Sequence, residues 1–123
     1  RKAVELQAMD VAKDWLEQRG YEWDDRSSTD SFDLLASKNG ISHKVEVKGT
    51  TSDICDAIVM TKNEVDLHSR EKGTTALAVV SSIRLDRKAE PVQASGGSIE
   101  MLWEWDIDEW TSEAIAYQIK RKL

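Results

Sequence analysis

The sequence contains little cysteine, histidine or proline, and it has no long apolar run. A single cysteine, Cys55, and two histidines exclude an internal disulfide and a structural zinc site built from Cys and His. No apolar stretch approaches the roughly 18 residues that a membrane span requires. The chain also lacks the charged and then apolar start of a signal peptide. These absences predict a cytoplasmic domain with no membrane partner.

The sequence also has fewer basic than acidic residues, with 17 Lys and Arg against 23 Asp and Glu, which gives a net charge of −6. Contacts between basic side chains and phosphates dominate nonspecific DNA binding, so we expect no large DNA-binding surface here. A nuclease is not excluded, because bound metal would neutralise several acids and the rest of a larger protein could grip the DNA. The 123 residues fit one domain. The start at Arg1 leads us to expect that this domain, residues 1–123, is excised from a larger protein.

Residues 31–50 read as one β-hairpin. Asn39 and Gly40 are typical of the two central residues of a type I′ turn, and in that turn paired residues have numbers that sum to 79. Asp33 then lies directly opposite Glu46. Because side chains alternate along a strand, Lys48 shares the face of Glu46. The opposite face, which can be buried, carries Phe32, Leu34, Val45 and Val47.

Two carboxylates opposite each other repel, with Cβ atoms roughly 4.5–5.5 Å apart. A divalent cation held by both groups, or a proton shared between them, would compensate. The nearby lysine adds a positive group that can position a nucleophile or stabilise developing charge. Asp33, Glu46 and Lys48 together therefore indicate metal-dependent phosphodiester chemistry.

Helices and strands are expected on both sides of the hairpin. Apolar spacing predicts a helix over residues 2–19 that ends at Gly20, followed by a short strand at residues 21–25. After the hairpin, residues 57–60 are expected to form a short apolar strand. Thr61 and Glu64 have the form of a capping box, which predicts a helix to residue 71.

The last third of the chain predicts two strands and a helix. Residues 74–83 are apolar on both faces at their centre, which is typical of a strand covered on both sides. Residues 84–98 are polar and are expected to form a long loop. Residues 99–105 alternate, which predicts a strand with Met101, Trp103 and Trp105 on one face. A second capping-box form at residues 106–109 predicts a helix to residue 122.

Several polar residues near the hairpin can be assigned either a structural role or a role in the site. Glu5 lies at the edge of the first helix's apolar stripe, where it is either a solvated acid or a further group of the site. Thr50 and Thr51 either make a turn or donate hydrogen bonds to a phosphate. Lys62 and Asn63 begin a helix, a position that can also contact a phosphate backbone.

The order of helix, strand, hairpin with Asp33 and Glu46-x-Lys48, helix and strand resembles the PD-(D/E)xK restriction-endonuclease-like superfamily. Phe32 stands where that motif has proline. Val45-Glu-Val-Lys-Gly-Thr50, followed by Thr61-x-Asn63-Glu64 and an apolar strand, resembles the C-terminal domain family named after the plant protein NO VEIN. The resemblance covers about residues 1–83.

The resemblance implies a fold, a cofactor and a set of site residues. The fold is an α/β core of αβββαβ order, with a central mixed sheet flanked by helices and an extra C-terminal strand and helix. Asp33, Glu46 and the carbonyl of Val47 would hold Mg²⁺ or Mn²⁺. Lys48 would assist the attacking water, and Glu5 would complete the site.

The expected function is a Mg²⁺-dependent DNA endonuclease, the cleavage module of a restriction or anti-phage protein. The expected partners are DNA and other domains of the same polypeptide, and a homodimer that cuts both strands is left open. Two alternatives remain. One is an inactive nuclease-like domain that serves as a binding or scaffolding module, and the other is a nuclease for RNA or branched DNA.

Overall fold

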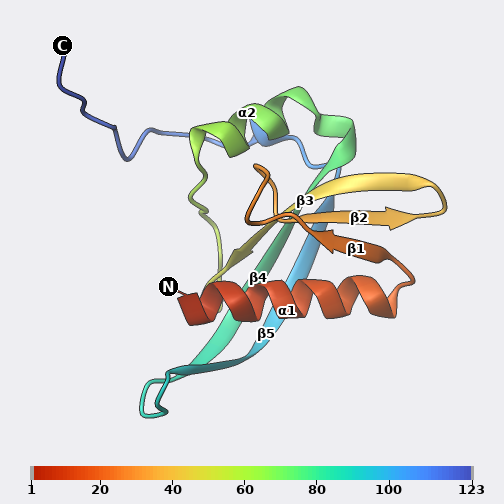
Figure 1. The fold of residues 1–123 in the computed structure, drawn as a ribbon, viewed down its shortest axis with the longest axis vertical. Coiled ribbons are helices and arrows are strands. Elements are labelled where there is room, and N and C mark those ends of the chain that lie inside the picture. Colours follow the sequence, from red (N-terminus) through yellow and green to blue (C-terminus); the bar gives the residue numbers. More distant parts are fainter. Residues whose placement is uncertain (1, 123) are drawn as a thin grey trace.

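The computed structural model of this chain describes residues 2–122. Its elements follow one another in the order drawn in Figure 1. The helices are α1 (Lys2–Gln18) and α2 (Lys62–Arg70), and the short 3-10 helices are η1 (Lys72–Thr74) and η2 (Ile107–Glu109). The strands are β1 (Glu22–Asp25), β2 (Leu34–Lys38), β3 (Ile41–Gly49), β4 (Thr75–Asp86) and β5 (Gln93–Trp103).

The strands form one mixed sheet in the order β1-β2-β3-β4-β5. Neighbouring strands are antiparallel except β3 and β4, which are parallel. A parallel pair needs a crossover connection, and the segment that contains α2 supplies it. The expected mixed α/β architecture is therefore confirmed.

Helix α1 covers one face of the sheet. Its buried residues Val4, Ala8, Ala12 and Leu16 recur every four positions and form a single stripe, as the apolar spacing predicted. Gly20 ends the helix with φ of +81°. The amide of Tyr21 donates to the carbonyl of Leu16, and the amide of Gly20 donates to that of Glu17, which is a Schellman motif.

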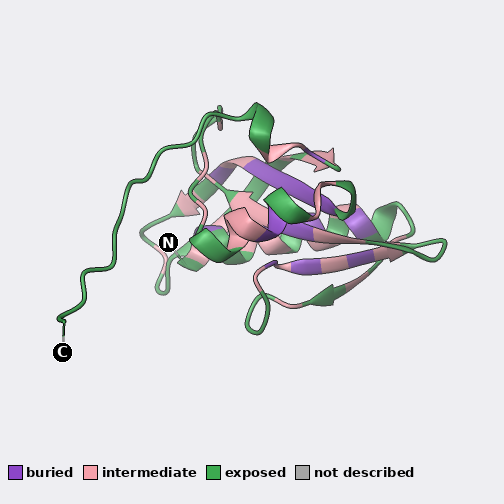
Figure 2. Cartoon of the chain, turned by 90° about the horizontal axis from the view of Figure 1, so that it is seen from above, coloured by how far each residue is buried: buried purple, intermediate pink, exposed green. Residues whose placement is uncertain are grey.

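Strand β4 is buried on both faces, as its sequence predicted. The five consecutive residues from Ala76 to Val80 are all buried, and they appear in the purple interior of Figure 2. Ala76 and Ala78 pack in the core that includes Leu16 of α1, whereas Leu77 and Val79 pack with Trp105 on the opposite side of the sheet. Two separate layers therefore cover the strand that lies beside the predicted acidic hairpin.

The capping box at the start of α2 is confirmed. The side chain of Thr61 accepts from the amide of Glu64 at 3.2 Å, and the carboxylate of Glu64 accepts from the amide of Thr61 at 3.0 Å. The prediction of a strand at residues 57–60 is wrong, because this segment pairs with no strand. Ile58 and Met60 instead pack beside Leu77, since the segment crosses the face of the sheet.

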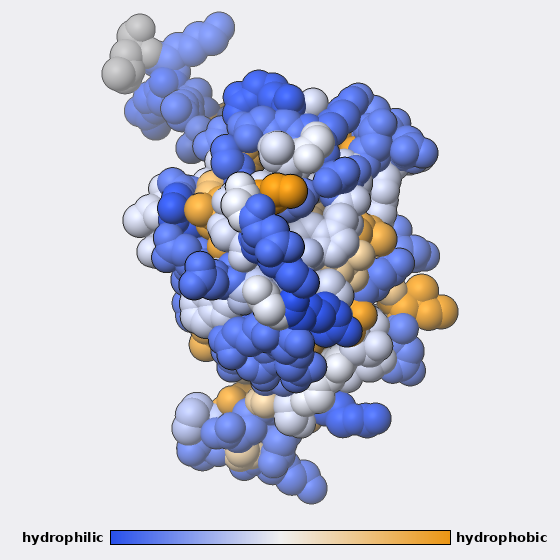
Figure 3. Space-filling model, turned by 90° about the vertical axis from the view of Figure 1, so that its right-hand side faces the viewer, coloured by the Kyte–Doolittle hydropathy of each residue, from blue (hydrophilic) through white to orange (hydrophobic). Residues whose placement is uncertain are grey.

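Residues 84–98 are not a loop, and this prediction is wrong. β4 continues to Asp86 and pairs with β5 from Gln93, so only a short turn separates the two strands. The ladder is made by backbone groups. Polar side chains are tolerated because this end of the hairpin extends past α1 (Figure 1) and most of its residues are exposed. Its surface, at the lower end of Figure 3, is mostly hydrophilic.

Two predictions for the C-terminal end are also wrong. Met101 and Trp103 pack on the α1 side, but Trp105 packs on the opposite side with Leu77. Between the two tryptophans, Glu104 has φ of +51°, which breaks the alternation of the strand. The helix expected over residues 106–122 is reduced to η2, and residues 111–122 form neither helix nor strand and are exposed. Helix stability depends mainly on packing of an apolar face, and this segment packs against nothing in the described chain.

None of the helices within residues 2–122 combines the length and the apolar character needed to cross a membrane.

We expect Gly49→Ala to destabilise the domain, because α1 lies close to the end of β3. A Cβ at Gly49 would lie 2.7 Å from Cβ of Ala8 and 3.3 Å from the carbonyl oxygen of Val4. Such overpacking lowers the free energy of unfolding by about 1–3 kcal/mol. Urea unfolding followed by circular dichroism measures the loss. Gly73→Ala is the matched control, since a Cβ there meets nothing within 4 Å, and an equal effect of both substitutions would contradict the packing argument.

Candidate metal and active site

The β2–β3 hairpin has the predicted turn and register. Asn39 and Gly40 have φ of +54° and +78°, the left-handed values of a type I′ turn. Leu34 pairs with Val45, and these numbers sum to 79 as expected. The register therefore sets Asp33, one residue before β2, beside Glu46 of β3.

Asp33 is fixed to β3 by its backbone and by its side chain. Its amide donates to the carbonyl of Val45 at 3.0 Å, and its carboxylate accepts from the amide of Val47 at 2.8 Å. The side chain is half-buried, and burial raises the pKa of Asp33 despite that hydrogen bond and the charge of Lys48. The carboxylate is thus held at a defined place next to Glu46.

Glu46 is the most deeply buried acid of the site, with only 2% of its surface exposed. Its Oε2 lies 3.1 Å from Nζ of Lys48, while its Oε1 is buried with no hydrogen-bond partner. Burial, and next the charge of Asp33, raise the pKa of Glu46 to about 8. The two neighbouring acids therefore hold a proton at neutral pH unless a cation replaces it.

Lys48 is held between two carboxylates. Its Nζ lies 3.1 Å from Oε2 of Glu46 and 3.3 Å from Oε1 of Glu64. Burial lowers the pKa of Lys48, but the charges of Glu46 and Glu64 outweigh burial and raise it above its usual value. The ammonium group therefore stays charged between the two carboxylates.

Glu64 is a site residue that the sequence interpretation missed. Its position in the capping box explains one contact, the hydrogen bond from the amide of Thr61, and gave no reason to expect another. The structure adds the contact with Lys48 through the same oxygen, Oε1. The available signal was the Thr61-x-Asn63-Glu64 segment, which places an acid in the first turn of the helix after the lysine strand.

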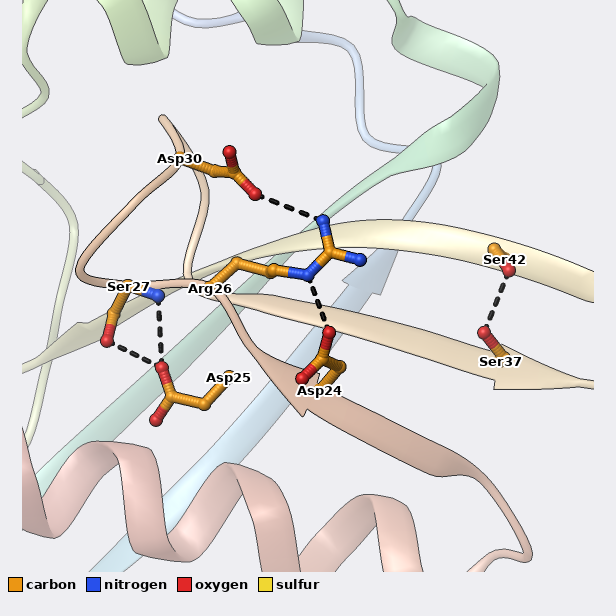
Figure 4. A network of polar contacts seen from close by, with 7 residues as sticks. All are labelled: Asp24, Asp25, Arg26, Ser27, Asp30, Ser37 and Ser42. Atoms are coloured by element: carbon orange, nitrogen blue, oxygen red, sulfur yellow. Dashed lines mark hydrogen bonds and ion pairs between the residues drawn. The ribbon is translucent and has the colours of Figure 1, made fainter.

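A cleft of about 460 Å³ opens beside Glu64. One wall is the loop between β1 and β2, and the other is the start of α2. The lining residues are Thr29, Asp30, Ser31, Thr61, Asn63 and Glu64. Figure 4 shows how the loop is braced, because the guanidinium of Arg26 contacts Asp24 at 2.6 Å and Asp30 at 3.1 Å. The amide of Arg26 also donates to the carbonyl of Asp33, which ties this wall to the acidic pair.

The other predicted site residues are more dispersed. Glu5 is exposed in the first turn of α1. The hydroxyl oxygen of Thr50 accepts from the amide of Ser52 at 3.1 Å, as in a turn, and Thr51 is exposed. Lys62 is exposed and contacts Asp66 at 2.8 Å, whereas Asn63 lines the cleft. Roles for these residues in catalysis or nucleic-acid binding stay predictions.

The residues present fit a magnesium ion with few protein ligands. Within residues 2–122, no three His, Cys, Asp or Glu side chains form a metal-binding group, so Glu5 does not join Asp33 and Glu46 in one. Mg²⁺ commonly uses only one or two carboxylates and keeps several waters. The unpartnered Oε1 of Glu46 is a buried acceptor that a cation would satisfy.

His68 helps to fix the position of α2 beside the site. It is fully buried on α2, and its Nδ1 accepts from the indole of Trp105 at 2.9 Å. Burial lowers the pKa of His68 to about 4, so the ring is neutral at physiological pH. The pair fixes α2 against the sheet and keeps Glu64, one turn earlier on the same helix, facing Lys48.

The chain matches one family model, described as Protein NO VEIN, C-terminal, over residues 4–93. This match spans most of the chain and includes Asp33, Glu46, Lys48 and Glu64, so the chain belongs to that family. No curated protein and no solved structure matches the chain.

We expect the burial of Glu46 to make stability depend on pH. A carboxyl whose pKa is raised in the folded state binds its proton more tightly there than in the unfolded chain. Its stabilising contribution is therefore complete below pH 4.5 and is lost as pH rises through about 8. Relative to Glu46→Gln, the wild-type chain should lose on the order of a few kcal/mol across this interval.

Urea unfolding at a series of pH values measures this loss. Glu22→Gln, at an exposed strand position, is the matched control and should follow the wild-type curve. A constant difference between wild type and Glu46→Gln from pH 4.5 to pH 8 would contradict the argument.

Proposed function

We propose that this chain, as a member of the NO VEIN C-terminal family, is a metal-dependent DNA endonuclease domain that serves a restriction or anti-phage protein. The observation that carries the proposal is the buried, unpartnered Oε1 of Glu46 beside a second acid, Asp33, and a charged lysine, Lys48. A structural role alone gives no reason to bury a carboxyl group in this way.

The fold supports the same proposal. The chain runs as helix, three antiparallel strands, helix and a strand parallel to the third, which is the order implied by the resemblance to restriction-endonuclease-like enzymes. The acid pair and the lysine all lie on the β2–β3 hairpin, Asp33 directly before β2 and the other two on β3, where that resemblance puts catalytic groups. The restriction-endonuclease-like core remains part of the proposal.

Asp33 and Glu46 would hold the metal, together with the carbonyl of Val47 by the same resemblance. Bound Mg²⁺ would polarise the phosphate and favour ionisation of a water. Cation binding and protonation compete for Glu46, since both satisfy the same buried oxygen. Val47 contributes independently through its amide, which orients the carboxylate of Asp33.

Lys48 would orient the attacking water and stabilise negative charge that develops on the phosphate. Glu46 and Glu64 hold its ammonium from two sides, so little reorganisation is needed when substrate arrives. By the same resemblance, the water oxygen would attack phosphorus and release its proton to solvent as the bond to the 3′ oxygen breaks. The products would be a 5′-phosphate and a 3′-hydroxyl, whose oxygen takes up a proton from solvent.

The cleft beside Glu64 is a candidate binding site for the DNA strand. Asn63 lines it, and the adjacent Lys62 is exposed, as is Thr51 in the segment after β3. Asp30 and Glu64 also line it, and a charge of −6 gives the isolated domain little attraction for a polyanion. Other domains of the same polypeptide would therefore supply most of the DNA-binding contacts. RNA and branched DNA would undergo the same chemistry.

We expect Mg²⁺ or Mn²⁺ to raise the melting temperature, and to raise it more at pH 8 than at pH 6, because the metal must displace the proton on the acid pair. At a hundredfold excess over Kd the stabilisation is about 2.7 kcal/mol, or several degrees in a domain of this size. Differential scanning fluorimetry measures the shift. Asp33→Asn should abolish it, and Asp10→Asn, at an exposed position of α1, should leave it unchanged. An equal shift in wild type and Asp33→Asn would place the metal elsewhere.

We expect Lys48→Ala to reduce Mg²⁺-dependent plasmid cleavage by about a hundredfold or more, the usual effect of losing one charge-stabilising group. Lys44→Ala is the matched control. Lys44 lies on the same strand and face but pairs with Glu71 at 2.9 Å, so its loss should leave cleavage within a few-fold of wild type. Cleavage by Lys48→Ala at the wild-type rate would refute the mechanism. Metal binding without cleavage, in the full-length protein, would instead favour the binding or scaffolding module.

A further inference from the structure

Strand β5 forms an open edge of the sheet, because it pairs with β4 on one side and with no described strand on the other. A hollow of about 540 Å³ runs along this edge. Its lining includes the four consecutive residues Glu100–Trp103, together with Val79 of β4, Cys55, Trp105 and Trp110. Val79, Leu102 and Trp105 belong to the face opposite α1, whereas Met101 and Trp103 point to the α1 side, so the hollow extends from that opposite face to the outer edge of β5. We call this hollow the edge groove.

An exposed edge with free backbone groups is a ready template for another strand. Natural sheets often protect such edges with a covering segment, a bulge or a proline. The edge groove of β5 is instead lined by three tryptophans, Trp103, Trp105 and Trp110. Trp105 is buried, but Trp110 is 36% exposed and offers apolar surface to a segment that pairs there. The groove therefore fits an extended segment with apolar side chains.

The C-terminal tail, residues 111–122, has the sequence of such a segment. Ile115, Tyr117 and Ile119 are 68%, 79% and 89% exposed. They alternate with Ala116 and Gln118, so in an extended strand the three large apolar side chains would share one face. β-branched and aromatic residues also favour strands.

Charge favours contact between the tail and the edge groove. The tail has one acid, Glu113, and ends in Lys120, Arg121 and Lys122. Three acids line the groove, namely Glu100, Asp106 and Glu109. Opposite charges at a strand pair stabilise it and set its register.

The direction of the tail indicates whether it would bind the edge groove of its own chain or that of a second copy of the chain. Trp110 lines the groove of its own chain, but the residues after it run away from the body and from β5 in both views of the fold (Figure 1, Figure 2). A second copy can receive the tail without any reversal of the chain.

We propose that the tail of one copy pairs with the edge groove of a second copy as a sixth strand, and that the exchange is reciprocal. Reciprocal exchange gives a closed two-fold dimer, the commonest symmetry of homo-oligomers. Each sheet is then extended at its β5 edge by the tail of the other copy, and the Glu46 sites lie on separate copies.

Sedimentation velocity of the whole chain, over a range of protein concentrations and salt, tests this proposal. We expect a dimer that weakens as salt rises. Ile115→Ser with Ile119→Ser should weaken dimerisation about tenfold or more, as loss of buried apolar anchors does at interfaces. The melting temperature of the monomer should not change, since the tail packs on nothing in the described chain. Leu6→Ser, at an exposed apolar position of α1, is the matched control and should dimerise as wild type does.

Exchanging the charges of the groove acids and the tail bases tests whether these residues contact each other in the dimer. Glu100→Lys with Glu109→Lys should weaken the dimer, as should Lys120→Glu with Arg121→Glu. An equimolar mixture of the two double variants should recover association, because both tail–groove contacts of the mixed dimer then join opposite charges. A monomer at every concentration would overturn the proposal, including a monomer whose tail amides are protected from hydrogen exchange by its own groove. A dimer that the tail substitutions leave unchanged would overturn it too.

Discussion

The structure around the candidate site depends on one unfavourable contact, the burial of Glu46 beside Asp33. A buried carboxyl loses its hydration, and a second carboxyl next to it adds repulsion if both ionise. The pKa of about 8 for Glu46 expresses both effects. The elements around it act to hold this arrangement in place, because β3 is paired on both sides and the amide of Val47 fixes Asp33. The fold thus supports a local arrangement that it would be more stable without.

Much of this arrangement could be predicted from the sequence because local chemistry determines it. Asn39 and Gly40 determine the turn, the turn determines the register, and the register brings the two acids together. The same holds for the helix stripe from Val4 to Leu16 and for the capping box at Thr61. Each of these depends on residues close in the sequence, so tertiary contacts had little opportunity to override them.

The errors arise where distant contacts decide the outcome. Beyond Ile83, Leu85 and Ala94 pack against the core beside Val4 and Ala8, but most residues of that end of the hairpin are polar and exposed, so the apolar pattern is too weak to predict a strand. Trp105 changes faces because Glu104 adopts a positive φ, which nothing in its sequence neighbourhood requires. The tail has spacing compatible with both a helix and a strand, and the described chain offers it no surface to pack on. Glu64 was assigned a local role alone because its second contact, Lys48, lies 16 positions earlier in the sequence.

The two contacts of Glu64 converge on a single atom. Its Oε1 accepts the amide of Thr61 at 3.0 Å and the ammonium of Lys48 at 3.3 Å, so one oxygen both closes the first turn of α2 and holds the charged group of the site. When a bound phosphate attracts that ammonium, or a bound cation repels it, the oxygen keeps only its hydrogen bond to the helix. The amide of Thr61 then experiences a different electric field, so the start of α2 is a built-in reporter of whether the site is occupied.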